Sequence, residues 1–319
     1  MNTLDLSLVI PLLNEQDSIE ELYSRIDKVC KDHGISYDVW FVDDGSTDRS
    51  WSIIENLKEK HGEIHGIKFS KNYGKSQALH AAFAAVTGEV VITMDADLQD
   101  FPEEIPELYH MIILDNYDIV SGWKKKRFDN VMTKNLPSKL FNAAARKVSG
   151  VSLHDFNCGL KAYRKKVVKS IDVYGDMHRY IPVLAANAGF RNITEKPVQH
   201  QARPYGSSKF GTERFIRGFL DLITLWFVSR FGGRPMHFFG AIGTLMFIVG
   251  FLSAVWLGIS KLIDVSRGIY GNLIANNPWF FIALTMMILG TLLFIGGFLG
   301  ELIIRNNRKH ENYHIEEII

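Results

Sequence analysis

The first 200 residues alternate short apolar runs with longer segments in which apolar residues recur at helical spacing. The short runs predict β-strands at 6–10, 38–42, 64–69, 89–93 and 118–121. The segments between them predict helices at 18–33, 48–60, 75–86 and 102–114. Thr47 or Ser46 can cap the second helix, and Pro102 suits the first turn of the fourth. This alternation predicts an α/β fold, a mostly parallel sheet with helices on both faces.

Two much longer apolar segments follow the α/β region. No charged residue occurs from Pro235 to Ser260, and none occurs again from Gly268 to Gly300. Each segment exceeds the roughly 20 residues that cross the hydrocarbon core of a bilayer. The second is expected to span from near Trp279 to Gly300. Their length and their content of Gly and Phe favour membrane spans over buried helices of a soluble protein.

Basic residues flank this expected hairpin at both ends. They are Arg230, Arg234, Arg305, Arg308 and Lys309. The connector between the spans carries only Lys261 and Arg267 as basic residues. Because Lys and Arg concentrate on the cytoplasmic side, both termini are expected to be cytoplasmic. We therefore expect a multi-pass protein of the cytoplasmic (inner) membrane, with its α/β domain in the cytoplasm.

The chain divides into four predicted segments: an α/β domain at 1–209, a linking helix at 210–234, a two-helix hairpin at 235–304 and a cytoplasmic tail at 305–319. Apolar residues of the linking helix recur at helical spacing, and Arg214 and Arg217 lie on its other side. Two interpretations stay open for it. It lies in the headgroup plane of the lipid bilayer, or it packs on the α/β domain.

Composition narrows the classes of protein that fit. The chain has 319 residues, 47% of them apolar and 22% charged, with a net charge of +1. The absence of a basic excess argues against nucleic acid as a partner. Cys30 and Cys158 lack metal-like spacing, so they indicate a reducing compartment without a disulfide framework.

Polar clusters follow each of the first four predicted strands, at 11–15, 43–46, 71–75 and 95–99. Each alone is also typical of a polar turn. Because the carboxyl ends of parallel strands meet at one sheet edge, the four together favour a polar ligand that carries phosphate. Asp95 and Asp97 can both reach one divalent cation there. An NAD site is disfavoured, because Pro11 and Glu15 stand where a Gly-x-Gly-x-x-Gly motif would follow the first strand.

Six motifs occur in order along the chain. They are Val9–Glu15, Val42–Asp48, Asn72–Lys75, Asp95–Gln99, His154–Gly159 and Arg203–Lys209. The set resembles the family 2 glycosyltransferases, and within them the polyprenyl-phosphate glycosyltransferases related to dolichyl-phosphate mannose synthase. The hairpin resembles the bacterial branch that adds glucose or a modified aminoarabinose to undecaprenyl phosphate. The resemblance implies a nucleotide-sugar-binding domain of the GT-A type.

The resemblance also implies where the donor nucleotide binds. Pro11, Asn14 and Glu15 are expected to lie around the nucleotide. Asp43 is expected to hydrogen-bond the base or the ribose, and Asp44 is expected to support the same loop.

Asp95 and Asp97 are expected, by the same resemblance, to hold Mg²⁺ or Mn²⁺ against the donor diphosphate. Gln99 is expected to be a further oxygen ligand, and Lys75 joins the donor-binding residues. Hard cations prefer oxygen ligands, and Mg²⁺ is usually shared between one or two carboxylates and substrate phosphates. The expected cofactor is therefore Mg²⁺ or Mn²⁺.

The acceptor site is expected to combine one carboxylate with several basic residues. Asp155 stands where many family 2 enzymes place a catalytic carboxylate. A lipid phosphate is already ionised at pH 7, so Asp155 is expected mainly to orient the donor sugar or a basic residue, with base catalysis second. Lys124, Lys134, Arg203 and Lys209 are the candidates for binding the phosphates, and the last two bracket a Gly-Ser-Ser loop that resembles the family's closing loop.

The resemblance implies an inverting, metal-dependent sugar transfer from a nucleotide-sugar to undecaprenyl or another polyprenyl phosphate. A UDP-hexose is the first choice of donor and GDP-mannose the second, and a homo-oligomer such as a tetramer is expected. A processive polysaccharide synthase is an alternative, but the Gln-x-x-Arg-Trp motif is missing, because Pro204 follows Gln199–Arg203. A non-catalytic membrane scaffold is another, disfavoured by the intact Asp95, Asp97 and Asp155.

Overall fold

A computed structural model describes residues 4–125, 146, 150–173, 175, 177–201, 204, 227, 231, 234–269, 273–306 and 315–318. The chain forms two compact units, one of Met1–Ser229 with Glu311–Ile319 and one of Arg230–His310. The linking helix expected at 210–234 lies outside the described residues, apart from isolated positions.

An eight-stranded sheet forms the centre of the first unit, in the order β7-β5-β6-β4-β1-β2-β3-β8. The strands are β1 (Leu6–Leu12), β2 (Tyr37–Asp43), β3 (Ile64–Phe69), β4 (Val90–Thr93), β5 (Ile119–Trp123), β6 (Lys161–Arg164), β7 (Ile193–Pro197) and β8 (Ile315–Ile318). β4, β1, β2 and β3 run parallel, and so do β5 and β7. β6 is antiparallel to β4 and β5. The α/β class is confirmed, and so are the five predicted strands, whereas β6, β7 and β8 are not among the predictions.

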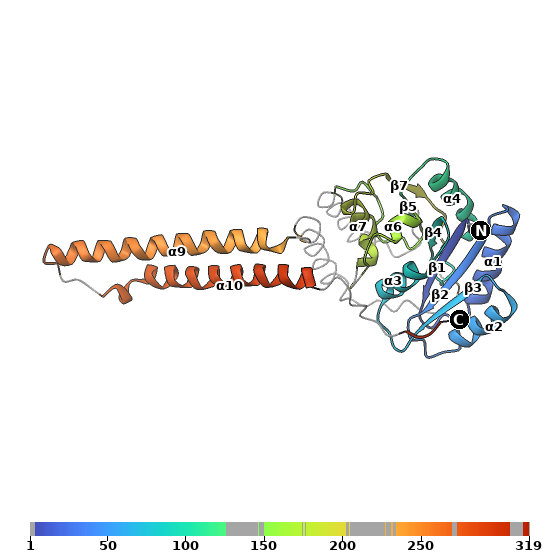
Figure 1. The fold of residues 1–319 in the computed structure, drawn as a ribbon, viewed down its shortest axis with the longest axis horizontal. Coiled ribbons are helices and arrows are strands. Elements are labelled where there is room, and N and C mark those ends of the chain that lie inside the picture. The colour runs from blue at the N-terminus through green and yellow to red at the C-terminus, as the bar shows by residue number, and fades with distance from the viewer. Residues whose placement is uncertain are drawn as a thin grey trace. The chain divides into compact units, whose positions relative to one another are not determined.

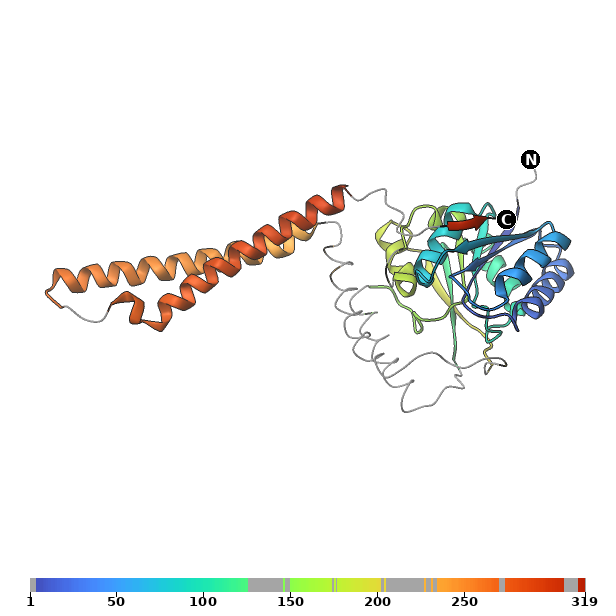
Figure 2. The same cartoon turned by 90° about the horizontal axis from the view of Figure 1, so that it is seen from below.

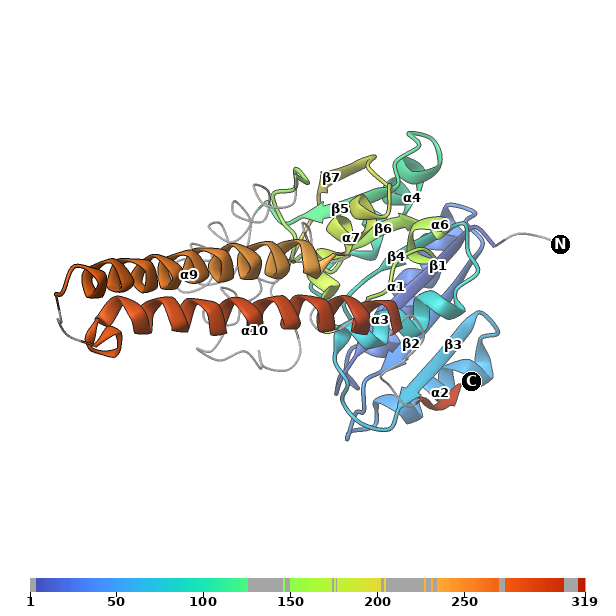
Figure 3. The same ribbon diagram turned by 60° about the vertical axis from the view of Figure 1, so that its left-hand side comes forward.

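Helices cover both faces of this sheet (Figures 1 and 3). α1 (Ile19–Asp32), α2 (Ser50–Lys60) and α4 (Ile105–Ile113) pack on one face, whereas α3 (Lys75–Ala85), α6 (Lys165–Val168) and α7 (Ile181–Asn187) pack on the other. β1 is buried along its whole length, because Leu8 and Ile10 enter one core and Val9 enters the other. Short 3₁₀ turns, η1 (Pro102–Glu104) and η3 (Met177–Tyr180), precede α4 and α7. Pro102 thus begins the helical segment, as predicted.

The predicted cap of the second helix is wrong. α2 begins at Ser50, with Arg49 at the N-cap position and no side-chain cap. Ser46 and Thr47 instead join two loops, because Ser46 Oγ accepts a hydrogen bond from the Asn14 backbone N–H (2.9 Å) and the Thr47 N–H donates to Asn14 Oδ1 (2.8 Å). These side chains hold the loops after β1 and β2 together rather than starting a helix.

The last described residues of the chain return to the sheet. β8 pairs antiparallel with β3, with Ile318 opposite Ile67 and Glu317 opposite Lys68. Figure 2 shows this short strand, in red, next to the C-terminus. Because β8 follows the helical hairpin in the chain, the α/β unit contains residues from both sides of the hairpin.

The second unit is a helical hairpin of α9 (Pro235–Ser266) and α10 (Pro278–Asn306), with the 3₁₀ turn η4 (Ile274–Asn276) before α10. The helices lie side by side (Figure 1) and approach closely at small residues. A Cβ added to Gly243 would lie 2.5 Å from the Gly290 carbonyl oxygen, and one added to Gly250 would lie 2.6 Å from that of Ala283. Close backbone approach at small residues is typical of helix pairs in membranes.

Both helices of the hairpin are long and apolar enough to cross a membrane. Many of their large apolar side chains are exposed, for example Trp256 at 70% and Leu262 at 71%. Such a continuous apolar surface is unfavourable in water and fits a lipid environment. The predicted apolar spans coincide with α9 and α10.

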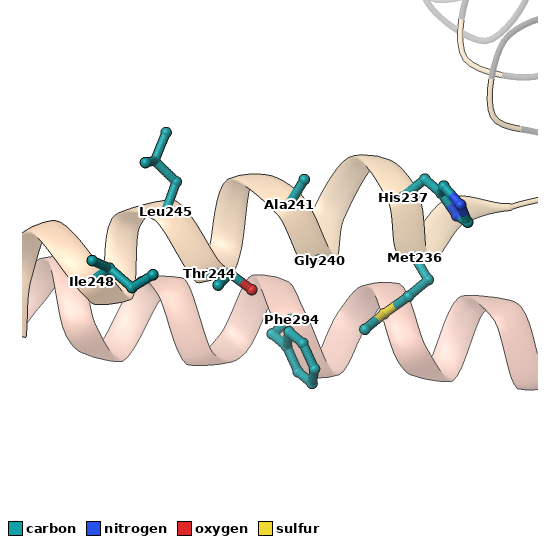
Figure 4. A pocket seen from close by; sticks show the side chains of 8 residues that line it. All are labelled: Met236, His237, Gly240, Ala241, Thr244, Leu245, Ile248 and Phe294. Carbon is teal, nitrogen blue, oxygen red and sulfur yellow. The ribbon is translucent and has the colours of Figure 1, made fainter.

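An open depression of about 570 Å³ lies on the hairpin near the start of α9 (Figure 4). Met236 and Gly240 of α9 and Phe294 of α10 line it, and only His237 and Thr244 add polar side-chain atoms. A nucleotide needs several hydrogen-bonding groups for its base and phosphates, so this depression does not suit one. The polar site belongs to the sheet.

Candidate active site

The segment that follows β4 places oxygen-bearing side chains at every second position. Asp95, Asp97 and Gln99 are half-buried, whereas Ala96 and Leu98 between them are buried. Partial exposure therefore falls on the two carboxylates and the amide, while the residues between them anchor the segment in the interior. The Asp-x-Asp motif lies at the carboxyl end of a central parallel strand, as the sequence predicts.

The segment after β4 contains one left-handed residue and is fixed by hydrogen bonds. Leu98 has φ of +57°, a left-handed conformation that is uncommon for a branched residue and that concentrates at functional sites. Its carbonyl accepts a hydrogen bond from Gln201 Nε2 (2.7 Å), and the Gln99 backbone N–H donates to Asp97 Oδ1 (3.2 Å). Gln99 Nε2 faces the Gln201 carbonyl at 3.4 Å, and Oε1 is the atom of this amide suited to a cation.

Asp95 is paired with Lys75, the first residue of α3. The Lys75 ammonium donates directly to Asp95 Oδ1, and each side chain is about one-third exposed (33% for Lys75 and 32% for Asp95). Burial alone would raise the pKa of Asp95, but the charges of Lys75, Lys124 and Lys161 outweigh it and hold this pKa well below its usual range. Asp95 is therefore a carboxylate at every physiological pH.

Asp44 fixes the loop from which Lys75 projects. The backbone N–H groups of Tyr73 and Gly74 donate to its carboxylate, at 2.7 and 2.9 Å. Burial raises the pKa of Asp44, although these two hydrogen bonds oppose that change. Asp44 joins the end of β2 to the start of α3, so its contacts position Lys75.

Asp43 is fully buried at the end of β2. Its Oδ1 accepts a hydrogen bond from the Ser46 backbone N–H (2.8 Å), while Oδ2 has no hydrogen-bond partner among the described residues. Burial raises the pKa of this carboxyl. A buried acceptor without a partner is costly unless a ligand satisfies it, and an N–H of a nucleotide base can do so.

The nucleotide residues predicted at and after the end of β1 lie next to the loop that follows β2. Pro11 is part of β1 and pairs with Val42 of β2. Asn14 has φ of +54°, and the next residue, Glu15, donates its backbone N–H to Ser50 Oγ (3.0 Å). The structure thus brings the loops after β1 and β2 together at one edge of the sheet, where the sequence analysis expects the nucleotide.

Asp155 lies in a loop that is anchored at its start by His154. The His154 ring stacks on Trp123 (centroids 4.5 Å apart), and its backbone N–H donates to Glu195 Oε2 (2.6 Å). Asp155 is only 2% exposed, and its Oδ1 accepts a hydrogen bond from the Asn157 backbone N–H (3.0 Å). This carboxylate therefore helps to shape its own loop.

The same loop packs directly on Asp95. A Cβ added to Gly159 would lie 2.4 Å from Asp95 Oδ2, and the Gly159 carbonyl accepts a hydrogen bond from Thr93 Oγ1 (2.8 Å). Beneath the loop, the buried Lys161 ammonium donates to the carbonyls of Phe156 (3.2 Å) and Cys158. Burial lowers the pKa of Lys161. Lys161 and Gly159 thus position the loop, and neither role is evident from the sequence.

One of the expected basic residues is already paired with a carboxylate of the protein. Lys124 is only 13% exposed and forms an ion pair with Asp100 (2.8 Å). The expectation that Lys124 binds a lipid phosphate therefore lacks support, because its ammonium is already committed to a buried carboxylate. Lys134, Arg203 and Lys209 lie outside the described residues.

His178 is a further neighbour of the site that sequence analysis misses. Its backbone N–H donates to Ser76 Oγ (3.0 Å), and Ser76 Oγ also lies 3.1 Å from His178 Nδ1. Burial, with the nearby charge of Lys75, lowers the pKa of His178 to about 3. His178 is thus neutral at physiological pH, and it joins η3 to the helical turn that carries Lys75. Its position, 102 residues after Ser76, gives no signal in the sequence.

We expect this buried histidine to make the first unit sensitive to acid. The unfolded chain binds a proton at His178 below about pH 6.5, whereas the folded chain does not until about pH 3. Its contribution is complete above the unfolded pKa and falls as the pH decreases, by about 2 kcal/mol at pH 5. Urea unfolding of wild type and His178→Asn at pH 7 and pH 5 measures this. The wild type should lose more stability between the two pH values than the variant, and equal losses would contradict the assignment.

A divalent cation fits the carboxylate pair only as a site shared with substrate. Among the described residues, no group of three or more His, Cys, Asp or Glu side chains can hold a metal. Asp95, Asp97 and Gln99 offer two carboxylates and one amide, all partly exposed. Mg²⁺ typically binds one or two carboxylates plus substrate phosphates, so these residues suit a cation that arrives with a diphosphate.

A second hollow, of about 1060 Å³, lies between η1, α4 and the end of β7. Three carboxylates (Glu103, Glu104 and Glu107) and two lysines (Lys125 and Lys196) line it. The Lys196 ammonium contacts Glu104 and lies 2.7 Å from Glu107. Since negative charge predominates and Lys196 is already paired, this hollow does not favour a phosphate.

The sheet order, the polar carboxyl edge of the sheet and the Asp-x-Asp pair are typical of one class of protein: a glycosyltransferase with a GT-A-type fold, here joined to two apolar helices. Comparison with family models agrees, because residues 7–172 match the model for glycosyl transferase family 2. The chain belongs to this family. The predicted fold class, family and enzyme class are therefore confirmed.

Two curated relatives match the chain over nearly its whole length. The dodecaprenyl-phosphate galacturonate synthase of Rhizobium johnstonii is 31% identical over 323 residues, which cover 100% of this chain and 94% of the relative. The undecaprenyl-phosphate 4-deoxy-4-formamido-L-arabinose transferase of Pseudomonas paraeruginosa is 33% identical over 318 residues, covering 98% of this chain and 90% of the relative. The resemblance to polyprenyl-phosphate glycosyltransferases is thus confirmed.

Solved structures confirm the fold. Glucosyl-3-phosphoglycerate synthase from Mycobacterium tuberculosis, in complex with Mn²⁺, UDP and glucosyl-3-phosphoglycerate, superposes with a TM-score of 0.53. The match has 20% sequence identity and covers 70% of this chain and 79% of that chain. At this identity the similarity supports the shared fold alone.

Proposed function

We propose that this glycosyltransferase moves a sugar from a nucleotide-sugar to a polyprenyl phosphate at the cytoplasmic face of the membrane, with inversion at the anomeric carbon. The observation that carries the proposal is the alignment of Asp95, Asp97 and Gln99 on the partly exposed side of the segment after β4. The names of both relatives, which describe sugar transfer to dodecaprenyl or undecaprenyl phosphate, support the acceptor class.

The donor would bind across the carboxyl edge of the sheet. The unpartnered Oδ2 of Asp43 would accept a base N–H, and the loops joined by Asn14 and Ser46 would surround the ribose. Asp95, Asp97 and Gln99 would hold Mg²⁺ or Mn²⁺ beside the diphosphate. When bound there, the cation would neutralise charge that develops on the departing nucleoside diphosphate.

The acceptor needs no general base, because a phosphate monoester is ionised at pH 7. Its oxygen would form a bond to the anomeric carbon while the bond from that carbon to the diphosphate oxygen breaks. The buried Asp155 would shape the loop that packs on Asp95 and keep the sugar side of the site in place. The product would be a polyprenyl-monophosphate sugar.

The position of β8 supports the expected membrane topology. The chain up to Ser229 and the strand after α10 belong to the same α/β unit. A hairpin that leaves one folded unit and returns to it must cross the bilayer an even number of times. Two crossings by α9 and α10 would place both ends of the hairpin on the cytoplasmic side with the active site, where nucleotide-sugars occur.

The experiment that tests this function is transfer of radiolabelled sugar to undecaprenyl phosphate by the purified full-length protein. The donor panel would include UDP-glucose, UDP-galacturonate, UDP-4-deoxy-4-formamido-L-arabinose and GDP-mannose, each with Mg²⁺, Mn²⁺ or chelator. We expect a labelled, organic-extractable lipid that disappears with chelator, and a UDP-sugar as the best donor. A water-soluble polymer would favour a processive synthase instead. No product and no nucleotide binding would favour a non-catalytic scaffold.

A further inference from the structure

Three lysines lie around the single carboxylate of Asp95. Lys75 donates directly to Oδ1, and Lys124 and Lys161 act on it electrostatically. The negative charge of Asp95, which the proposed function assigns to a divalent cation, is thus already balanced by a lysine of the protein. A cation that approaches Asp95 meets the Lys75 ammonium in direct contact with Oδ1, and this repulsion opposes its binding.

Of these three lysines, only Lys75 can move away from Asp95 without losing a second partner in the protein. Lys161 is buried and donates to the carbonyls of Phe156 and Cys158, whereas Lys124 is buried and paired with Asp100. Lys75 is one-third exposed and is the first residue of α3, so its side chain can rotate away by giving up its ion pair with Asp95. Its flexible four-carbon stem lets the ammonium reach a neighbouring anion.

We propose that Lys75 occupies the cation position at Asp95 until a donor diphosphate arrives, so that divalent metal binds tightly only together with the donor. This inference rests on the proposed function, because it requires a diphosphate at the sheet edge. The diphosphate accepts the Lys75 ammonium, and the vacated carboxylate then takes the metal. Metal and donor must therefore raise each other's affinity by the same factor.

The arrangement has a functional consequence. Without a donor, Asp95 stays paired with Lys75, and divalent cations bind to the site only weakly. With a donor, one lysine moves from carboxylate to diphosphate, so no charge is left unpaired. Lys75 then competes with the metal for Asp95 and also binds the donor diphosphate. Removing its ammonium should raise the affinity for the metal alone and lower the affinity for the donor.

The test is Mn²⁺ binding to the detergent-purified full-length protein, measured by electron paramagnetic resonance of free Mn²⁺ with and without UDP. For wild type we expect weak binding of Mn²⁺ alone and tighter binding with UDP. Lys75→Met should bind Mn²⁺ alone about tenfold more tightly, and its affinity for UDP in the presence of Mn²⁺ should fall about tenfold. Lys75→Arg, which keeps the charge, should resemble wild type.

Lys60→Met is the matched control. Lys60 is exposed at the end of α2, and it belongs to none of the polar clusters at the carboxyl edge of the sheet. It should leave both affinities unchanged, which would separate the Lys75 contact from a general loss of one positive charge. Thermal unfolding of each variant checks that the fold is retained.

Two results would overturn the inference, and they are distinguishable. If Lys75→Met binds Mn²⁺ alone no more tightly than wild type, while UDP still promotes Mn²⁺ binding, the lysine does not compete with the cation for Asp95. The proposed function then stands. If Mn²⁺ binds to none of the proteins even with saturating UDP, the metal site itself is wrong, and the proposed mechanism fails with the inference.

Discussion

Asp97→Asn is expected to lower the rate of sugar transfer by about a thousandfold while leaving the protein folded. The substitution keeps an oxygen that can accept the Gln99 backbone N–H, so the turn after β4 is preserved. It removes the negative charge on which a divalent cation depends. Transfer of radiolabelled sugar to the lipid acceptor, measured at saturating Mn²⁺, gives the rate.

Asp32→Asn is the control for this prediction, because Asp32 is exposed at the end of α1. It should retain full activity. Thermal unfolding should show similar midpoints for both variants and wild type. Full transfer by Asp97→Asn would show that Asp97 holds no cation needed for the reaction, and the metal assignment would have to be abandoned.

Gly159→Ala is expected to reduce transfer by at least about a hundredfold, through Asp95 rather than through any direct contact with substrate. The new methyl carbon would lie 2.4 Å from Asp95 Oδ2 and 2.6 Å from its Cγ. Contacts this short require movement, so the Asp95 carboxylate, the loop that carries Gly159 or both must shift. Because Asp95 also pairs with Lys75, both the metal and the donor contacts should weaken. Mn²⁺-dependent UDP binding and the transfer rate should therefore fall together.

A glycine at the surface provides the comparison. A Cβ added to Gly62 would have nothing within 4 Å, and this residue is exposed. Gly62→Ala should therefore bind UDP and transfer sugar as wild type does. If Gly159→Ala retained normal UDP binding and turnover, the close packing of the loop on Asp95 would have no functional role.

Sequence reasoning locates the parts of this site that follow predictable strands. Asp43 and Asp95 come directly after β2 and β4, whose apolar runs are evident, so the rule for parallel sheets places them at one edge. The first four strand–helix pairs are predictable for the same reason. The local pattern of apolar residues is sufficient to predict these pairs, because each strand is followed directly in the chain by the helix that packs on it.

The remainder of the site depends on long-range contacts that leave no local pattern. β6 has only four residues, yet its antiparallel insertion between β4 and β5 brings Gly159 onto Asp95. Lys124 begins a basic run that is typical of an exposed surface, but Asp100 holds it in the interior. His178 shows no periodicity that marks it as a neighbour of α3. Such contacts follow from the order of the strands, which periodicity does not encode.

The return of β8 to the sheet makes the membrane hairpin an insertion within the catalytic unit rather than an appendage at its end. A fragment that stops before α9 would lack β8 and would expose the backbone hydrogen-bonding groups of β3, an edge that promotes aggregation. Proteolysis within 307–314 would leave the catalytic unit attached to the hairpin through the segment before α9. A soluble version of the enzyme is therefore best made by replacing the hairpin with a short flexible linker and retaining Ile315–Ile318.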